Sequence, residues 1–303
     1  MAQLVKEVID YGLNYWDYIS DPRTSSWPLM SSPIPTLVMV AGYLYTVLIL
    51  GPTLMDNRKP FKLREVLIVY NAAQVIYSAA MFYEHLMGGW LFEYSYSCQP
   101  VDYSHSPVAM RMAELCWWYY ISKLTEFLDT LFFVMRKKNN QISLLHVYHH
   151  SMTPIMTWVL VRFLAGGHGT FSNLINNLVH VIMYFYYMMT AMGPQYQKYI
   201  WWKKHLTTVQ LVQFLMVFVH SANALFSSDC SYPKLISAFL VVHSCIFFGL
   251  FLDFYIKAYR RENRPKSIDA LDTLKGVHNA PALAATPVLT PAAEGPTPKI
   301  KTQ

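Results

Sequence analysis

Three histidines stand close together in the stretch LLHVYHHSM, residues 144–152, which is otherwise largely apolar. They are His146, His149 and His150. Positions i, i+3 and i+4 lie on one face of an α-helix, so a helix here would point all three imidazoles the same way. Imidazoles grouped in this way can bind a metal, transfer protons or attack an electrophile. The stretch therefore predicts a reactive site built on a helix.

Polar side chains also interrupt three other apolar segments. They occur in KLTEFLDT (residues 123–130), in NNLVHVIMYFYY (residues 176–187) and in TTVQLVQ (residues 207–213). Spacings of three or four residues again place them on one helix face in each segment. We expect them to bind substrate or to support the histidines. These residues are Lys123, Glu126, Asp129, Asn176, His180, Tyr184, Tyr187, Gln210 and Gln213.

Purely structural roles compete with this interpretation. Lys123 and Glu126 could form only a buried ion pair, and Gln210 and Gln213 could only join helices by hydrogen bonds. Tyr184 and Tyr187 could be core aromatics. Six further histidines are isolated in the sequence, and we expect no chemistry from them. They are His85, His105, His168, His220, His243 and His278.

The composition predicts an all-α protein that crosses a membrane several times. Of 303 residues, 54% are hydrophobic and 14% are charged, against about 25% charged residues in a soluble domain. Seven apolar segments are each long enough to cross about 30 Å of hydrocarbon as a helix. An ionisable residue inside such a segment indicates function, because burying it is costly. The segments are 34–55, 65–86, 113–135, 142–164, 170–192, 206–226 and 233–256.

Basic residues predict how the chain is oriented. The connections after the first, third, fifth and seventh segments carry 15 Lys or Arg, whereas the amino-terminal segment and the other connections carry 3. Basic loops face the cytosol. Residues 1–33 are therefore expected to form a luminal segment and 34–256 the transmembrane domain. Residues 257–303 are expected to be a cytosolic tail, first basic and then disordered because it is rich in Pro, Ala and Thr.

This topology places the polar residues at similar depths. At 1.5 Å per residue from the cytosolic helix ends, Glu126 lies about 14 Å deep, His149 about 11 Å and His180 about 18 Å. Asp129 comes to about 9 Å, and Gln210 to Gln213 to about 8–12 Å. Four helices of alternating direction thus bring their polar groups into one layer. We expect one buried polar site that opens towards the cytosol.

Cysteine and lysine positions add two expectations about the cell compartment. Cys98 and Cys230 both fall on the non-cytosolic side, where a disulfide can persist, although they could also be two unrelated thiols. Lys299 and Lys301, in the terminal KIKTQ, resemble a dilysine signal for return to the endoplasmic reticulum, or are simply part of a basic tail.

The histidines leave more than one function open at this point. A metal-dependent membrane hydroxylase or desaturase is one alternative, but such enzymes need several histidine boxes and this chain has one, plus His180. A seven-span receptor or transporter is another, yet it would not explain histidines at the depth of carboxylates and glutamines. No nucleic-acid partner is expected.

Four motifs together resemble the very-long-chain fatty-acid elongases, the ELO family of 3-ketoacyl-CoA synthases. KxxExxDT, HxxHH, NxxxHxxMYxYY and TxxQxxQ occur in that order at 123–130, 146–150, 176–187 and 207–213. The resemblance implies seven transmembrane helices, six of them in a ring around a closed-ended acyl tunnel, in the endoplasmic reticulum. Within that family, a threonine such as Thr207 at the first position of the last motif indicates a preference for saturated and monounsaturated substrates.

The resemblance also implies a reaction. Long-chain acyl-CoA would condense with malonyl-CoA to give a 3-oxoacyl-CoA, CO₂ and CoA, with no cofactor and no metal. His149 would be the nucleophile, paired with His180, while His146 and His150 orient it and transfer protons. Asn176 would donate to an oxyanion or support His180, and Glu126 and Asp129 would fix imidazole tautomers.

Partners follow from the same reaction. Besides the two CoA thioesters and the lipid bilayer, the protein could meet a second copy of itself or other enzymes of the elongation cycle. The CoA phosphates would contact basic residues of the cytosolic loops and tail, unless these only set topology. The candidates are Lys137, Lys138, Lys203, Lys204, Arg260, Arg261 and Arg264.

Overall fold

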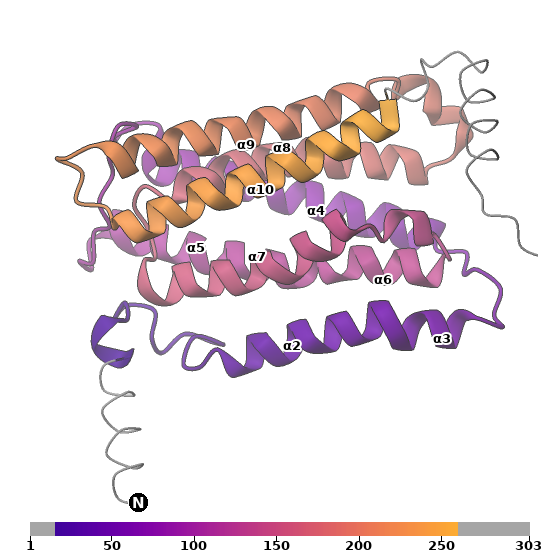
Figure 1. Cartoon of the computed structure of the whole chain (residues 1–303), viewed down its shortest axis with the longest axis horizontal. Coiled ribbons are helices and arrows are strands. Elements are labelled where there is room, and N and C mark those ends of the chain that lie inside the picture. The colour runs from indigo at the N-terminus through magenta and orange to yellow at the C-terminus, as the bar shows by residue number, and fades with distance from the viewer. Residues whose placement is uncertain (1–15, 260–303) are drawn as a thin grey trace, which may run out of the picture. The chain divides into compact units, whose positions relative to one another are not determined.

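The computed structural model describes residues 16–259, and this part of the chain is helical, with no strand (Figure 1). One compact unit ends at Lys257, and a second unit begins at Ala258. Residues 1–15 and 260–303 lie outside the described part. The tail expected from 257 onwards therefore falls almost entirely outside it, as do Arg260, Arg261, Arg264, Lys299 and Lys301.

A helix occupies each of the seven apolar segments, in two cases continued by a π-helical turn. Short 3₁₀ turns at Asn139–Gln141 and Pro194–Tyr199 lie in connections. The helical elements are α2 (Ile34–Tyr45), η1 (Thr46–Leu50), α3 (Gly51–Met55), α4 (Arg64–His85), η2 (Leu86–Trp90), α5 (Pro107–Thr125), α6 (Phe127–Met135), α7 (Leu144–Phe163), α8 (Thr170–Ala191), α9 (Lys203–Phe226) and α10 (Lys234–Tyr259).

Four of these helical stretches are long and apolar enough to cross a membrane by themselves. They are Ile34–Met55, Arg64–Trp90, Lys203–Phe226 and Lys234–Ala258. The other three segments, which form α5 with α6, α7 and α8, contain the lysine, carboxylates, histidines and asparagines of the predicted site, and these lower their mean hydropathy. That these three segments also cross the membrane therefore stays a prediction.

One predicted boundary is wrong by about two turns, because the third helix begins at Pro107 and not near residue 113. Ser106 caps this helix, since its hydroxyl accepts a hydrogen bond from the Ala109 amide. Pro107 then fits the first helical position, where no amide donor is needed. The capping residues give a better boundary than the hydropathy of the segment.

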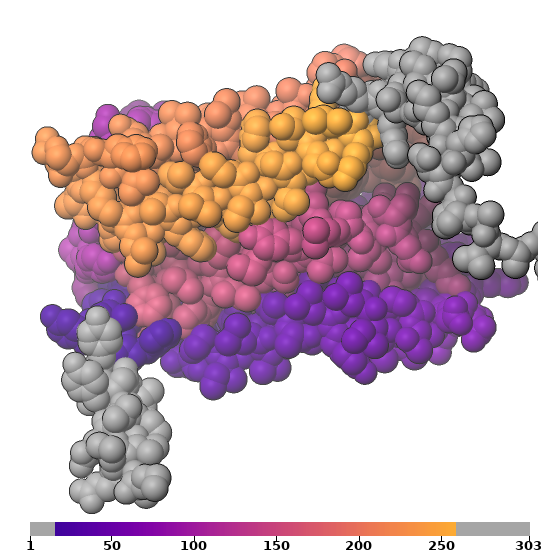
Figure 2. Space-filling model, viewed as in Figure 1, coloured from indigo at the N-terminus to yellow at the C-terminus, as the bar shows by residue number. Residues whose placement is uncertain are grey.

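Neighbouring helices pack in a closed series of contacts. Helix α4 packs on α5 and, along much of its length, on α8; α7 packs on α5, and α8 on α9. Helix α10 completes the series, because the Phe247 ring lies 5.4 Å from Phe214 of α9 and 5.3 Å from His149 of α7. Helix α2 packs on the outside of α7. Figure 2 shows α10, α7 and α2 as successive bands on one face.

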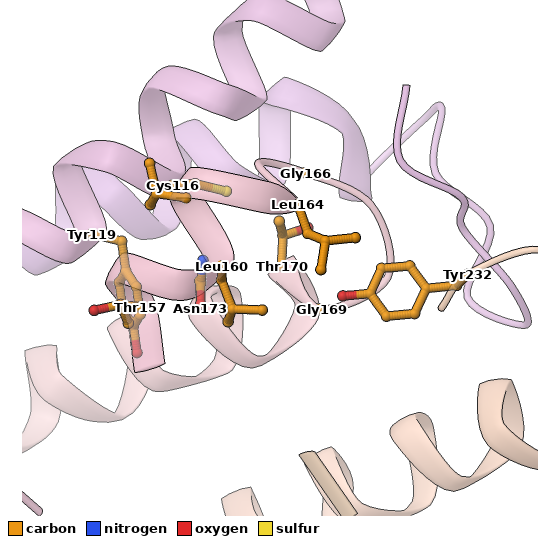
Figure 3. A pocket seen from close by; sticks show the side chains of 11 residues that line it. Cys116, Tyr119, Thr157, Leu160, Leu164, Gly166, Gly169, Thr170, Asn173 and Tyr232 are labelled. Atoms are coloured by element: carbon orange, nitrogen blue, oxygen red, sulfur yellow. The ribbon is translucent and has the colours of Figure 1, made fainter. Parts of the chain in front are cut away.

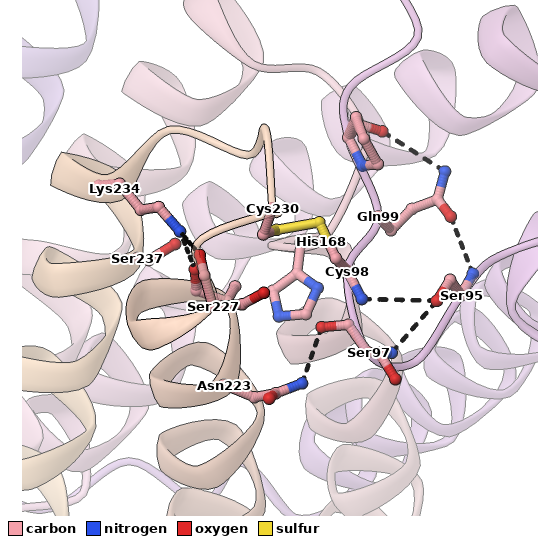
Figure 4. The surroundings of a disulfide bond; sticks show 12 residues. Ser95, Ser97, Cys98, Gln99, His168, Asn223, Ser227, Cys230, Lys234 and Ser237 are labelled. Atoms are coloured by element: carbon pink, nitrogen blue, oxygen red, sulfur yellow. Dashed lines mark hydrogen bonds between the residues drawn. A yellow bond between two sulfur atoms is a disulfide. The ribbon is translucent and has the colours of Figure 1, made fainter.

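A disulfide joins two connections at one end of this bundle, which we call the disulfide end (Figure 4). Cys98, between η2 and α5, is bonded to Cys230, between α9 and α10. The Asn223 side-chain amide donates to the Ser97 carbonyl, and the Lys234 ammonium donates to the Ser227 carbonyl. The pairing is the one expected from topology.

Two histidines expected to be isolated meet at the disulfide end. The rings of His168 and His220 stack with centroids 3.7 Å apart, and His168 Nε2 lies 2.8 Å from the His220 carbonyl. The expectation of isolation was wrong because the two residues are far apart in sequence and only the packing of α9 beside the start of α8 brings them together.

The chain before α2 packs on the same end. The guanidinium of Arg23 pairs with Asp21 at 2.6 Å and donates to the carbonyls of Ala109 and Ala165. Met30 is fully buried among α5 and α7. Residues 16–33 therefore close the bundle at this end.

Candidate functional site

The centre of the site is an ion pair at the junction of α5 and α6. Lys123 Nζ lies 2.6 Å from Glu126 Oε1, and the two side chains are 1% and 2% exposed. Glu126 stands between the two helices, with a ψ of −13°. Because each charge is buried, neither is tolerable without the other. The pair fixes the carboxylate in the interior of the bundle.

Helix α8 adds a histidine and an asparagine to this pair. His180 Nδ1 lies 3.3 Å from the same Glu126 Oε1. Asn176, one turn earlier, accepts hydrogen bonds at Oδ1 from Lys123 at 2.9 Å and from the Tyr119 hydroxyl at 2.8 Å. Glu126 thus contacts His180, while Asn176 contacts the lysine that pairs with this carboxylate.

Helix α7 brings the three clustered histidines to the other side of Glu126. Ser143 caps the helix, since its hydroxyl accepts from the His146 amide. The ring of His150 lies 4.2 Å from that of His146 and 5.1 Å from that of His149. Potential ligand atoms of Glu126, His149 and His150 all lie within 4.8 Å of one another. The four motif histidines and the carboxylate therefore form one cluster.

Two polar atoms in this cluster are buried without a hydrogen-bond partner among residues 16–259, Oε2 of Glu126 and Nδ1 of His150. Unpaired polar atoms are costly in a protein interior and are concentrated at functional sites. Glu126, His149 and His150 could hold a metal ion by distance alone. The Lys123 ammonium beside the same carboxylate opposes a second cation there, because like charges repel at low dielectric.

His146 is held by two residues that the sequence interpretation missed. Its Nε2 lies 2.8 Å from the Thr130 hydroxyl, which is 2.9 Å from the hydroxyl of Tyr43 on α2. Thr130 is the last residue of KLTEFLDT, so the motif contained a signal for it. Tyr43 gave none, because nothing in its own segment shows that α2 lies beside α6.

Asp129 has a different partner from the one expected. Its Oδ2 accepts a hydrogen bond from the Tyr184 hydroxyl at 2.7 Å. It therefore fixes a tyrosine of α8, and its neighbour Thr130 contacts the imidazole instead. Tyr187 is 37% exposed, and its ring lies 6.1 Å from the ring of Tyr184.

The two glutamines belong to α9, which packs on α8. Gln213 is 6% exposed. Gln210 is half-buried, and its amide nitrogen lies 3.7 Å from the sulfur of Met183. No direct bond joins either glutamine to the histidines among the described residues.

Basic candidates for phosphate contacts lie at the end of the bundle opposite the disulfide. Lys138, Lys203 and Lys204 are exposed, with the Lys204 ammonium 5.8 Å from the centre of the Tyr255 ring. Lys137 is half-buried and donates to the Asp56 carbonyl at 2.9 Å. Three of these four candidate lysines are thus accessible to a ligand.

A narrow, mainly apolar cavity lies between this cluster and the disulfide end (Figure 3). Its walls come from α5, α7 and the start of α8, and the ring of Tyr232 points towards Gly169 from the connection before α10. A Cβ on Gly169 would stand 2.6 Å from the Tyr232 hydroxyl, so only glycine allows this approach. Leu160, in the wall, follows His149 by eleven residues, or about 16 Å of helix.

Comparison with known proteins agrees with the motifs. Residues 28–267 match the ELO family, described as the GNS1/SUR4 family. The chain is 55% identical over 252 residues to very long chain fatty acid elongase 7 of Drosophila melanogaster, covering 83% of this chain and 77% of that protein.

Vertebrate proteins match over a similar part of the chain. Very long chain fatty acid elongase 7 of Rattus norvegicus is 51% identical over 256 residues, 84% of this chain and 91% of the relative. Very long chain fatty acid elongase 4 of Homo sapiens is 46% identical over 249 residues, 82% and 79% of the two chains.

Proposed function

Because the chain belongs to the ELO (GNS1/SUR4) family and is a multi-pass membrane protein of fatty-acid elongation, we propose that it is the condensing enzyme of that process. It joins a long-chain acyl-CoA to malonyl-CoA and releases a 3-oxoacyl-CoA, CO₂ and CoA. The observation that carries this proposal is the contact of Glu126 with Lys123 and His180 beside His149.

The first half-reaction makes a covalent acyl-enzyme. A ring nitrogen of His149 attacks the thioester carbonyl, the carbon–sulfur bond breaks, and CoA leaves as a thiolate that takes up a proton. His149 is half-buried whereas His150 is buried, so His149 is the more accessible of the two. The ring of His150 lies 5.1 Å from that of His149 and 4.2 Å from that of His146, which Thr130 holds, so we assign the proton transfer to these two histidines.

The second half-reaction forms the new carbon–carbon bond. Malonyl-CoA loses CO₂, and the resulting enolate attacks the acyl carbonyl on His149. The carbon–nitrogen bond then breaks and returns the free imidazole. Hydrogen-bond donors in a dry site stabilise the enolate and the tetrahedral oxyanion. His180, oriented by Glu126 at 3.3 Å, is placed for this role, and the Lys123–Asn176 contact holds Glu126 in position.

The substrate chain would lie along the inside of the bundle. The closed series of contacts through α4, α5, α7, α10, α9 and α8, with α2 outside, supports six helices around a tunnel. The apolar cavity at Leu160 and Tyr232 has a volume of only about 10 Å³ and lies where the closed end of the tunnel would be, near the disulfide. CoA would approach the opposite end, where Lys138, Lys203 and Lys204 are exposed.

This assignment places the disulfide end in the lumen of the endoplasmic reticulum and the lysine end in the cytosol. A disulfide is stable in an oxidising compartment. Basic connections stay in the cytosol. The amino terminus would then be luminal and the carboxyl terminus cytosolic, with Lys299 and Lys301 available as a retrieval signal.

A metal-dependent hydroxylase or desaturase is a second candidate, favoured by one observation, the cluster of Glu126, His149 and His150 ligand atoms within 4.8 Å. In that case purified protein would contain a stoichiometric transition metal, and chelation would remove activity.

A panel of acyl-CoAs tests the proposed reaction. Purified protein in lipid vesicles receives radiolabelled malonyl-CoA with saturated, monounsaturated or polyunsaturated acyl-CoAs. We expect labelled 3-oxoacyl-CoA, equimolar CO₂, and preference for saturated and monounsaturated chains. Release of CO₂ without a longer acyl product would contradict condensation. Preference for polyunsaturated chains would contradict the substrate preference predicted from Thr207.

A further inference from the structure

A groove on the outside of the bundle combines charged and apolar residues between α4 and α5. It has a volume of about 370 Å³. Its charged residues are Glu84, Arg111 and Glu114, and its apolar wall includes Met81 and Trp118. The groove is separate from the histidine cluster, which lies among α5, α6, α7 and α8.

The charged residues are accessible. Arg111 donates to Oε2 of Glu84 through Nε at 3.0 Å and through Nη2 at 2.6 Å, yet the two side chains remain 43% and 40% exposed. Glu114 is exposed as well and makes no ion pair among residues 16–259. Two carboxylates and one guanidinium leave one excess negative charge in the groove.

The depth of these residues matches the boundary between head groups and acyl chains. The stretch Arg64–Trp90 is 27 residues long, or about 40 Å, and exceeds a hydrocarbon layer of about 30 Å. The exposed charges of Glu84 and Arg111 favour placing this excess of about 10 Å at the disulfide end, which puts Glu84, about 9 Å of helix before Trp90, at head-group depth. Arg111 and Glu114 stand at the matching level in the first two turns of α5.

The apolar part of the groove runs from this level towards the middle of the membrane. Tyr77 and Ala80 precede Glu84 on α4, and Trp118 follows Glu114 on α5, so all three lie deeper than the charges. Charged groups on a lipid-facing surface need polar partners. A groove that is charged at head-group depth and apolar below it has the polarity of a phospholipid.

We propose that this groove binds one ethanolamine phospholipid from the leaflet at the disulfide end. The lipid ammonium donates to the carboxylates of Glu114 and Glu84, and the lipid phosphate accepts from Arg111. The excess negative charge favours a head group with an ammonium over an anionic one. A primary ammonium has three N–H donors for carboxylates, whereas choline has none, so ethanolamine lipid binds in preference to choline lipid.

Native mass spectrometry of the full chain in detergent tests this proposal. Palmitoyl-oleoyl phosphatidylethanolamine and the matching phosphatidylcholine are added separately and in competition. Glu114→Gln removes a charged acceptor, and Ala80→Trp fills the groove without changing its charge. Glu65→Gln is the matched control, because Glu65 is an exposed residue at the other end of the same helix.

We expect wild-type protein and Glu65→Gln to retain one ethanolamine lipid in preference to the choline lipid. Glu114→Gln should weaken that adduct about tenfold, as loss of a hydrogen bond to a charged group implies. Ala80→Trp should remove it. Each variant must elute as a single species with an unchanged melting temperature, so that a lost adduct does not reflect misfolding. A variant that fails this check is replaced by Arg111→Gln, which removes the donor to the lipid phosphate and should also weaken the adduct.

Three results would overturn the proposal. One is equal retention of the two lipids by wild-type protein. Another is ethanolamine preference that survives both Glu114→Gln and Ala80→Trp. The third is a dimer that forms in place of the lipid adduct and is lost in Glu114→Gln, which would make the groove a contact between copies. None of these depends on the proposed condensation, which the elongation assay tests separately.

Discussion

At the scale of single residues, Glu126 connects the parts of the site. Its Oε1 contacts both the Lys123 ammonium and His180, and its Oε2 is buried beside the histidines of α7. A carboxylate that contacts both an ammonium and an imidazole fixes the position of each relative to the other. Activity should therefore depend on Glu126, although the proposed reaction forms no bond to it.

Glu126→Gln should lower the rate of product formation at least about a hundredfold, the scale of a misplaced catalytic group. It should also destabilise the protein by about 3–5 kcal/mol, because Lys123 is left buried without its counter-charge. Thermal unfolding in detergent and the elongation assay measure the two effects.

The double variant Lys123→Met/Glu126→Gln separates stability from activity. It removes both buried charges, so the melting temperature should recover towards wild type while activity stays low. Near wild-type activity in either variant would show that the ion pair only joins helices, the structural role that the sequence left open.

The sequence was informative about the histidines and carboxylates, but not about all their partners. Helical spacing and depth predicted that Glu126, His149 and His180 share one layer, and their side chains do lie together. Tyr43 could not be predicted, because it approaches from α2, whose neighbours the sequence does not show. Tyr119 stands one turn before Lys123 on α5, but the sequence does not show that α8 brings Asn176 to its hydroxyl. Asp129 was assigned to an imidazole, but Thr130, the next residue along α6, makes that contact, and Asp129 accepts a hydrogen bond from Tyr184.

At the scale of elements, the disulfide between the connections before α5 and α10 should stabilise the bundle. It closes a separation of 132 residues in sequence. A cross-link of this span reduces the entropy of the unfolded chain. Helices that stay in the membrane after unfolding reduce that gain, because their chain is already constrained.

Cys230→Ser should lower stability by about 2–4 kcal/mol. It should also remove the mobility shift that reduction causes on a denaturing gel. Cys245→Ser is the matched control, since Cys245 is a free and exposed cysteine of α10. A shift that persists in Cys230→Ser, or is lost in Cys245→Ser, would contradict the pairing.

Element boundaries followed capping more closely than hydropathy. Ser106 caps a helix that begins six residues before the predicted segment 113–135, and Ser143 caps one that begins two residues after the start of the predicted segment 142–164. The break at Glu126 could not be predicted, because KLTEFLDT has no Gly or Pro. The order of the helices around the bundle was likewise not contained in their hydropathy.

At the scale of the whole molecule, the described helices place two different environments on either side of the histidine cluster. Buried polar groups lie between an apolar cavity towards the disulfide end and accessible lysines at the other end. An acyl-CoA has the same division, with an apolar chain, a reactive thioester and a charged nucleotide. The positions of these features support a thioester held at the histidine cluster.

The central claim is that His149 carries the acyl group, and intact-protein and peptide mass spectrometry after incubation with acyl-CoA alone tests it most directly. Without malonyl-CoA, the protein should release one equivalent of CoA and gain one acyl mass on a peptide containing His149. His149→Ala should lose the adduct, while Cys116→Ala and Cys245→Ala should retain it. An adduct that survives His149→Ala, or CoA release that begins only when malonyl-CoA is added, would contradict the account.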